Sequence, residues 1–261
     1  MSCVSLIVVS NRLPFIVSKS SDGTFHRKPS AGGLVTAVAP VVVQCKGLWV
    51  GWPGPNLPQL LPVPEADPFD TSPTSGLQSS QIVSVELTDQ DFQLYYNGCC
   101  NATFWPLFHS MLERTVFQEQ FWNNYKNVNN NFAEATLGAL RHKQGGNNDV
   151  PIVWIQDYHL MLVAARLRQE NLPCKIGFFL HIPFPHWDIL RVFPWHMEIL
   201  MGILACDLVG FHIEDYCLNF LDCCERSLGL RIDKQAMTVA VANRTVRVQR
   251  FRVSVTDKSR S

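Results

Sequence analysis

The sequence has no long hydrophobic run and no excess of charge of either sign. No apolar stretch approaches the roughly 18 residues of a membrane-spanning helix, and the first five residues lack the basic flank of a secretory signal. Lysine plus arginine and aspartate plus glutamate number 22 each, so no overall field attracts nucleic acid or an anionic membrane. We therefore expect a cytoplasmic protein with neither nucleic acid nor a membrane as partner.

The sequence also lacks the short motifs of metal, redox and common nucleotide sites. Its nine cysteines form no CxxC pair, so we expect reduced, mostly buried thiols rather than zinc or redox chemistry. It contains no GxGxxG fingerprint, no GxxxxGK[ST] loop and no nucleophile elbow. We expect no metal and no cofactor.

What is present indicates an α/β protein with an ample core, since 47% of the 261 residues are hydrophobic. Apolar runs typical of buried strands alternate with helical patterns, which predicts a doubly wound parallel sheet with helices on both faces. The expected strands are 6–11, 47–52, 81–87, 150–155, 175–180 and 207–211. The expected helices are 34–43, 121–140, 160–169, 194–205 and 214–228, with a helix capped by Thr88 or Asp89, a proline-rich loop at about 53–80 and a turn at 145–149.

The first strand and the glycine pair after it suggest an anion site. Arg12 ends the run LIVVSNR, and Gly32 and Gly33 open the apolar segment that follows. Backbone N–H groups at a helix start and a guanidinium both bind phosphate oxygens. The alternative is a turn that only reverses the chain, with Arg12 as a surface charge.

Further polar side chains follow later strands, where parallel sheets bind ligands. Asp157 and His159 come after the strand at 150–155, and His181 after that at 175–180. A carboxylate and histidines suit sugar hydroxyls and proton transfer. The alternatives are a helix-capping Asp157 and a satisfied, half-buried His159.

Aromatic residues between 95 and 109 add a second sugar-binding signal. Tyr95, Tyr96 and Trp105 could stack on carbohydrate, although core packing is the alternative. From these residues alone, we predict an α/β domain that binds a sugar phosphate or a nucleotide sugar.

Seven segments resemble, in the same order over about residues 5–230, the N-terminal half of trehalose-6-phosphate synthases: VVSNRLP, SAGGLVTAV, GLWVGWPG, YYNGCCNATFWPLFH, WIQDYHLMLVAARLR, IGFFLHIPFP and DLVGFHIEDYCLNFL. The resemblance implies a GT-B glycosyltransferase with two Rossmann-like domains. It would transfer glucose from UDP-glucose to glucose 6-phosphate with retention of anomeric configuration, giving trehalose 6-phosphate, without a metal.

The same resemblance implies a role for each matching residue. Arg12 would grip the acceptor phosphate, while Tyr96, Trp105 and Asp157 would line the acceptor glucose. Gly32 and Gly33 would approach the donor diphosphate. His181 would lie close to the transferred sugar and, with Asp157, serve catalysis.

The chain also departs from that family pattern. It contains no RxDxxKG motif, and the residues after Val248 are polar and basic. We therefore expect one acceptor-binding domain over 1–248, a divergent, disordered tail over 249–261, no second domain and an inactive isolated chain. Two alternatives stay open: a non-catalytic regulatory or binding subunit that associates with full-length synthase, and a different nucleotide-sugar transferase.

Overall fold

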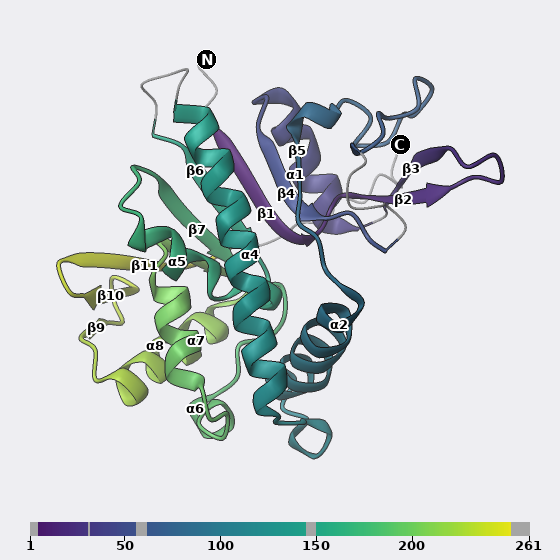
Figure 1. Ribbon diagram of the computed structural model, residues 1–261. Coiled ribbons are helices and arrows are strands. Elements are labelled where there is room, and N and C mark those ends of the chain that lie inside the picture. The colour runs from purple at the N-terminus through teal and green to yellow at the C-terminus, as the bar shows by residue number, and fades with distance from the viewer. Residues whose placement is uncertain (1–4, 31, 56–61, 145–149, 252–261) are drawn as a thin grey trace, which may run out of the picture.

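The computed structural model describes residues 5–30, 32–55, 62–144 and 150–251 (Figure 1). A nine-stranded sheet forms the centre, in the order β5-β4-β1-β6-β7-β8-β11-β10-β9. All neighbours from β5 to β11 pair in parallel, whereas the described pairs β11–β10 and β10–β9 are antiparallel. The predicted α/β class with a mainly parallel sheet is confirmed.

The sheet strands are β1 (Leu6–Arg12), β4 (Leu48–Trp52), β5 (Ile82–Ser84), β6 (Ile152–Gln156), β7 (Lys175–Phe179), β8 (Leu208–Phe211), β9 (Ile232–Asp233), β10 (Thr238–Val241) and β11 (Arg244–Arg250). The central strand is β1, whose Val8 pairs with Trp49 of β4 and Trp154 of β6. The strand order reverses beside β1, and in wound sheets the crevice at such a point holds the ligand.

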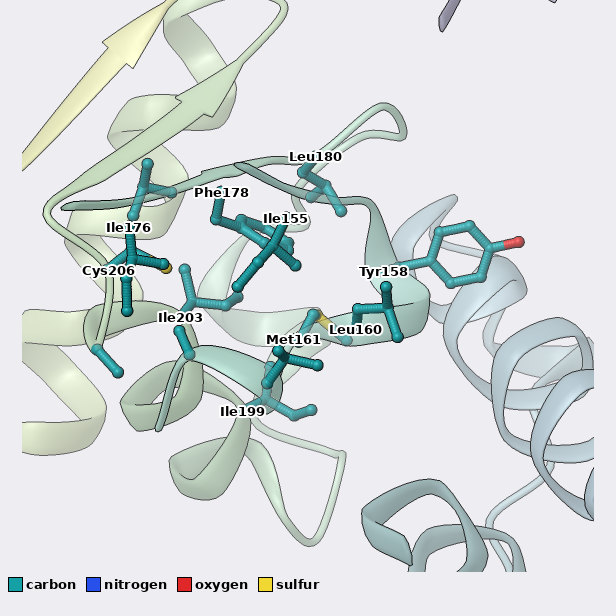
Figure 2. Close-up of a cluster of buried hydrophobic side chains, with 14 of the residues drawn as sticks. Ile155, Tyr158, Leu160, Met161, Ile176, Phe178, Leu180, Ile199, Ile203 and Cys206 are labelled. Atoms are coloured by element: carbon teal, nitrogen blue, oxygen red, sulfur yellow. The ribbon is translucent and has the colours of Figure 1, made fainter. Parts of the chain in front are cut away.

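Successive residues of β1 point to opposite faces of the sheet and enter two cores. Ile7 and Val9 belong to the larger core, which is formed with α4 (Glu119–Gln144), α5 (Val163–Gln169), α7 (His196–Leu204) and α8 (Glu214–Leu228). Figure 2 shows part of this core between the strands and α7, with Ile155, Phe178 and Ile203. Leu6 and Val8 belong to the smaller core.

The smaller core lies on the opposite face of the sheet. It is formed with α1 (Gly33–Gln44) and with the hairpin of β2 (Phe15–Lys19) and β3 (Phe25–Pro29), which projects at the right of Figure 1. Helices therefore pack on both faces. The side of α1 toward β6, β7 and β8 borders an apolar hollow of 590 Å³.

One helical stretch is unusual because most of it is π-helix. It begins with α2 (Asp89–Asp91), continues through the π-helical segment η2 (Phe92–Phe104) and ends with α3 (Trp105–Phe108). Thr88 caps it as predicted: the Asp91 N–H donates to Thr88 Oγ1, and the Thr88 N–H donates to Asp91 Oδ2. The sequence patterns did not predict the π conformation.

Short helical segments complete the connections: η1 (Ser79–Gln81), η3 (Leu112–Arg114), η4 (Tyr158–Leu160) and α6 (Trp187–Leu190). The hairpin β2–β3 and the edge formed by β9, β10 and β11 were not predicted. The predicted turn at 145–149 lies outside the described residues.

The predicted tail boundary is too early. Gln249 and Arg250 belong to β11 and pair with Gly210 and Phe211 of β8, so a tail starting at residue 249 is wrong for these two residues. The sequence alone concealed this strand because exposed polar side chains alternate with only two buried valines. Residues 252–261 lie outside the described part.

Seven described cysteines carry free, buried thiols, whereas Cys45 is disulfide-bonded, so the expectation of reduced thiols is wrong for Cys45. Within the ranges described, no helix is both long and apolar enough to cross a bilayer.

Candidate functional site

The site is built where neighbouring parallel strands end. Arg12 ends β1, Trp52 ends β4, and the two residues are register partners. Asp157 follows β6 and His181 lies two residues after β7. The strand order therefore brings the predicted Arg12, Asp157 and His181 to one edge of the sheet.

Arg12 is exposed and lies between two aromatic rings. Its guanidinium carbon is 4.8 Å from the centre of the Trp52 ring and 5.5 Å from that of Tyr96. In the described residues no carboxylate lies within ion-pair distance of it. Cation–π contact holds the guanidinium while leaving N–H groups free for an anion.

Sequence reasoning missed Trp52 as a site residue. The alternation in 47–52 predicted a strand that ends near a ligand or a turn, but nothing local marked Trp52, rather than Trp49, as a site residue. Trp49 is fully buried and its indole N–H donates to Ser10 Oγ at 2.8 Å. Only the register of β4 against β1 places Trp52 beside Arg12.

Tyr96 and Trp105 occupy different surroundings on the same helical stretch. The half-buried Tyr96 ring stacks between Phe92 and His159, at centroid distances of 5.1 and 5.9 Å. The Trp105 ring is 41% exposed and stacks on His109 at 4.2 Å. Among the described ring contacts, Trp105 contacts neither Tyr96 nor Arg12. Of the two predicted aromatic residues, Tyr96 is therefore the one that contacts Arg12 directly.

Tyr95, the other predicted aromatic candidate, is fully buried and points into the protein. Its hydroxyl donates to Asn11 Oδ1 at 2.8 Å and lies 3.2 Å from the His159 carbonyl oxygen. Core packing, the alternative weighed for the aromatic residues, describes Tyr95.

Asp157 has a strained backbone and a perturbed carboxyl. Its φ of 70° and ψ of 171° fall in a region that almost only glycine occupies. Its N–H donates to the Phe179 carbonyl at 2.7 Å, and its Oδ1 accepts from the His181 N–H at 3.0 Å. It makes no side-chain cap, so the capping alternative is wrong; burial raises the pKa of its carboxyl to about 6.

Both histidines near Asp157 favour the neutral form. Burial, and then the neighbouring His212, lowers the pKa of His181 to about 4. Burial, and then Arg12, lowers the pKa of the half-buried His159 to about 3. Neutral rings here can exchange hydrogen bonds with sugar hydroxyls without adding charge beside Arg12.

His181 is held by a buried glutamine. Its Nε2 lies 2.9 Å from Oε1 of Gln156, which is 1% exposed, while Gln156 Nε2 has no hydrogen-bond partner in the described residues. Gln156 and His181 line the apolar hollow together with Gly33, His212 and Phe251. The start of α1 and the ends of β6 and β7 thus face one space.

The two predicted glycines stand at the start of α1. Gly32 is its N-cap and Gly33 its first residue; both are exposed, and a side chain added at either meets nothing within 4 Å. Gly33 lines the hollow with His181, whereas Gly32 does not. Among the described residues, no group of three or more His, Cys, Asp or Glu side chains could hold a metal ion.

The chain is similar to known proteins over nearly its whole length. The sequence profile of glycosyltransferase family 20 matches residues 4–259. Trehalose-6-phosphate synthase of Mycolicibacterium vanbaalenii is 38% identical over 256 residues, covering 95% of this chain and 50% of that protein. The chain spans about half the length of the relatives it matches.

Two solved structures are similar at the level of fold. A Burkholderia xenovorans UDP-forming trehalose-phosphate synthase in complex with glucose-6-phosphate has a TM-score of 0.73 and 29% identity, over 96% of this chain and 50% of that one. An Escherichia coli protein bound with UDP-2-fluoro glucose has a TM-score of 0.73 and 31% identity, over 94% and 48%.

Proposed function

Because the chain belongs to glycosyltransferase family 20, we propose that it serves trehalose synthesis by holding glucose 6-phosphate at Arg12. The complete reaction would transfer glucose from UDP-glucose to that acceptor with retention of anomeric configuration and give trehalose 6-phosphate. Relatives named trehalose-6-phosphate synthase support this assignment. So does a similar structure in complex with glucose-6-phosphate.

The observation that carries the proposal is the free guanidinium of Arg12 between Trp52 and Tyr96. A phosphate there would accept paired hydrogen bonds from Arg12. The glucose ring would extend toward Asp157, whose carboxylate would accept from a sugar hydroxyl, with Tyr96 and the exposed Trp105 offering aromatic faces.

The donor belongs on the other side of Asp157 in this proposal. Gly32 and Gly33 would bring backbone N–H groups of α1 toward the diphosphate, and neutral His181 would hydrogen-bond the transferred glucose. The similar structure bound with UDP-2-fluoro glucose supports UDP-glucose as donor. Asp157 and His181 would act in catalysis, since each contacts the other and each would touch a substrate.

We further propose that transfer needs groups that this 261-residue chain does not supply. Charge developing on a departing diphosphate needs preorganised donors, and losing one such donor typically costs about a hundredfold or more in rate. The described donor side offers backbone N–H groups and neutral histidines, with His181 and Gly33 facing the hollow.

Thermal unfolding with glucose 6-phosphate tests acceptor binding. Ligand at about 100 times its Kd stabilises the folded state by about 2.7 kcal/mol, so the Tm should rise by several degrees. Glucose and inorganic phosphate, each alone, should raise it less. No shift with millimolar glucose 6-phosphate would contradict the proposal.

An assay of UDP release tests the need for further residues. The 261-residue chain should release no UDP from UDP-glucose and glucose 6-phosphate, and turnover would show that this chain suffices. Co-purification with a longer synthase would support the alternative of a regulatory or binding subunit. Such a subunit would bind the acceptor but would not catalyse transfer.

A further inference from the structure

The turn that carries Asp157 is fixed by side chains from a distant helix. Asp157 adopts a backbone conformation that is costly for any residue with a Cβ, and no side-chain cap offsets that cost. Such conformations persist only where surrounding contacts enforce them. Asp157 itself is bonded to the Phe179 carbonyl and to the His181 N–H, and the residues that follow it in the turn are bonded from α4.

Tyr125 of α4 binds two backbone groups of the turn. Its hydroxyl donates to the Tyr158 carbonyl at 2.8 Å and accepts from the Met161 N–H at 3.0 Å. The ring is fully buried and stacks on Trp122 at 5.5 Å, so its position is set by packing. Both hydrogen-bonding capacities of the hydroxyl are used on this one turn.

Asn129, one helical turn later, binds two further groups. Its Nδ2 donates to the His159 carbonyl at 3.0 Å, and its Oδ1 accepts from the Leu162 N–H at 3.0 Å. It is 1% exposed within a core of apolar side chains. A leucine could fill such a position with no polar atoms that need partners. The buried amide is therefore explained by its hydrogen bonds to the backbone of the turn.

The turn also has contacts on its outer side. Figure 2 shows the buried Tyr158 ring pointing away from the other labelled side chains of its cluster, and its hydroxyl donates to Asn101 Oδ1 at 3.3 Å. The hydroxyl of Tyr95 lies between the His159 carbonyl and Asn11, the residue before Arg12. The turn is therefore held between α4 and η2.

We propose that Tyr125 and Asn129 are positioning residues that hold the Asp157 carboxylate where the acceptor sugar binds. The inference rests on the proposed function for the role of Asp157, but the clamp itself is a property of the fold. Neither residue touches substrate. Both act through the backbone of residues 158–162.

A stability cycle tests the clamp without any ligand. Glycine adopts a φ of 70° freely, so Asp157→Gly removes the strain that the clamp must oppose. Without the Tyr125 hydroxyl the strained turn can relax, and this relaxation recovers strain energy in the wild type but none in the Asp157→Gly background. Tyr125→Phe should therefore lower the urea midpoint more in the Asp157→Gly background than in the wild type. Losses that are equal, or smaller in the Asp157→Gly background, would overturn the clamp. Asn129→Ala is measured in the same cycle, so that a poorly folding Tyr125→Phe does not decide the result.

A binding cycle tests the link to function. Tyr125→Phe should weaken glucose 6-phosphate binding about three- to tenfold, the range for one lost hydrogen bond, and leave inorganic phosphate binding unchanged. With Asp157→Asn already present, the same change should cost less than about twofold. An equal loss in both backgrounds, or no loss in the wild type, would overturn the positioning role.

Thr136→Val is the matched control. Thr136 is fully buried on α4, and its hydroxyl donates to the Phe132 carbonyl at 2.7 Å without reaching the turn. Thr136→Val should lower the stability of the protein and leave its affinities for glucose 6-phosphate and for inorganic phosphate unchanged. If wild-type protein binds no glucose 6-phosphate, the proposed function fails while the stability cycle still decides the clamp.

Discussion

Arg12 keeps its charge at the surface between two aromatic rings, and this arrangement separates binding from folding. An exposed guanidinium without a carboxylate partner among the described residues contributes little to stability. Its contribution should appear only when an anion binds. The residue can therefore be removed with little effect on the fold.

Arg12→Ala should weaken glucose 6-phosphate binding by about 1.5–3 kcal/mol, the range for a hydrogen bond to a charged group. Isothermal titration calorimetry measures the affinity and urea unfolding the stability, which should change by less than about 0.5 kcal/mol. Arg226→Ala, at an exposed arginine that pairs with Asp222 on α8, is the control and should leave affinity unchanged. Unchanged affinity in Arg12→Ala would make Arg12 a plain surface charge.

Asp157 costs the protein stability at neutral pH. Its folded pKa of about 6 exceeds the value of 3.8 for an unperturbed carboxyl. Between these values the folded state keeps a proton that the unfolded state releases, so stability falls as pH rises from about 4 through 6. The stability that the folded state gains by keeping the Asp157 proton is complete below pH 3.8 and is lost above pH 6.

Asp157→Asn should therefore stabilise the protein near pH 7 by about 1–2 kcal/mol, because the amide never ionises. Near pH 4 the gain should be much smaller. Urea unfolding at both pH values measures this, with Asp188→Asn on α6 as an exposed control. Lower stability of Asp157→Asn at pH 7 would contradict the raised pKa.

At the scale of elements, the stretch from α2 to α3 combines a regular start with an irregular interior. The capping box of Thr88 and Asp91 is local and sets where the helix begins. Asp91 Oδ1 also accepts from Asn124 of α4 at 2.9 Å, which ties the cap to the long helix. This element positions Tyr95 and Tyr96, so its stability bears on the site.

Thr88→Ala should cost about 1 kcal/mol of folding free energy, as for other lost N-caps. The urea midpoint measures this loss. Ser21→Ala, in the exposed turn between β2 and β3, should change the midpoint little. A Thr88→Ala protein as stable as the wild type would mean that packing alone fixes the start of α2.

At the scale of the whole molecule, the two faces of the sheet are covered unequally. Parallel sheets are normally covered on both faces. On the face that carries α1, side chains of β6, β7 and β8 line the apolar hollow, and Ile152 and Phe251 are 37% and 38% exposed. This surface should bind apolar probes.

The dye ANS should fluoresce with the native protein, and Ala37→Lys should reduce that signal. Ala37 lines the hollow, so a lysine there adds charge to an apolar surface. Thr36→Lys is the matched control, since Thr36 is exposed on the same helix and does not line the hollow. Equal signals from the two variants would place the dye elsewhere.

The sequence by itself determined the local elements and the candidates at strand ends. Apolar runs predicted six of the seven described strands that pair in parallel, all except β11, and the helix 214–228 agrees with α8. Arg12, Asp157 and His181 were predicted because parallel strands end at one edge. These inferences need only periodicity, capping chemistry and chain order.

Tertiary structure alone decided which residues meet across strands and helices. The register of β4 on β1 brings Trp52 to Arg12. The packing of α4 on the Asp157 turn gives Tyr125 and Asn129 their partners, and pairing with β8 makes Gln249 and Arg250 part of a strand. Such contacts join residues about 30 to 40 positions apart, and no local pattern encodes them because their energy comes from the partner surface.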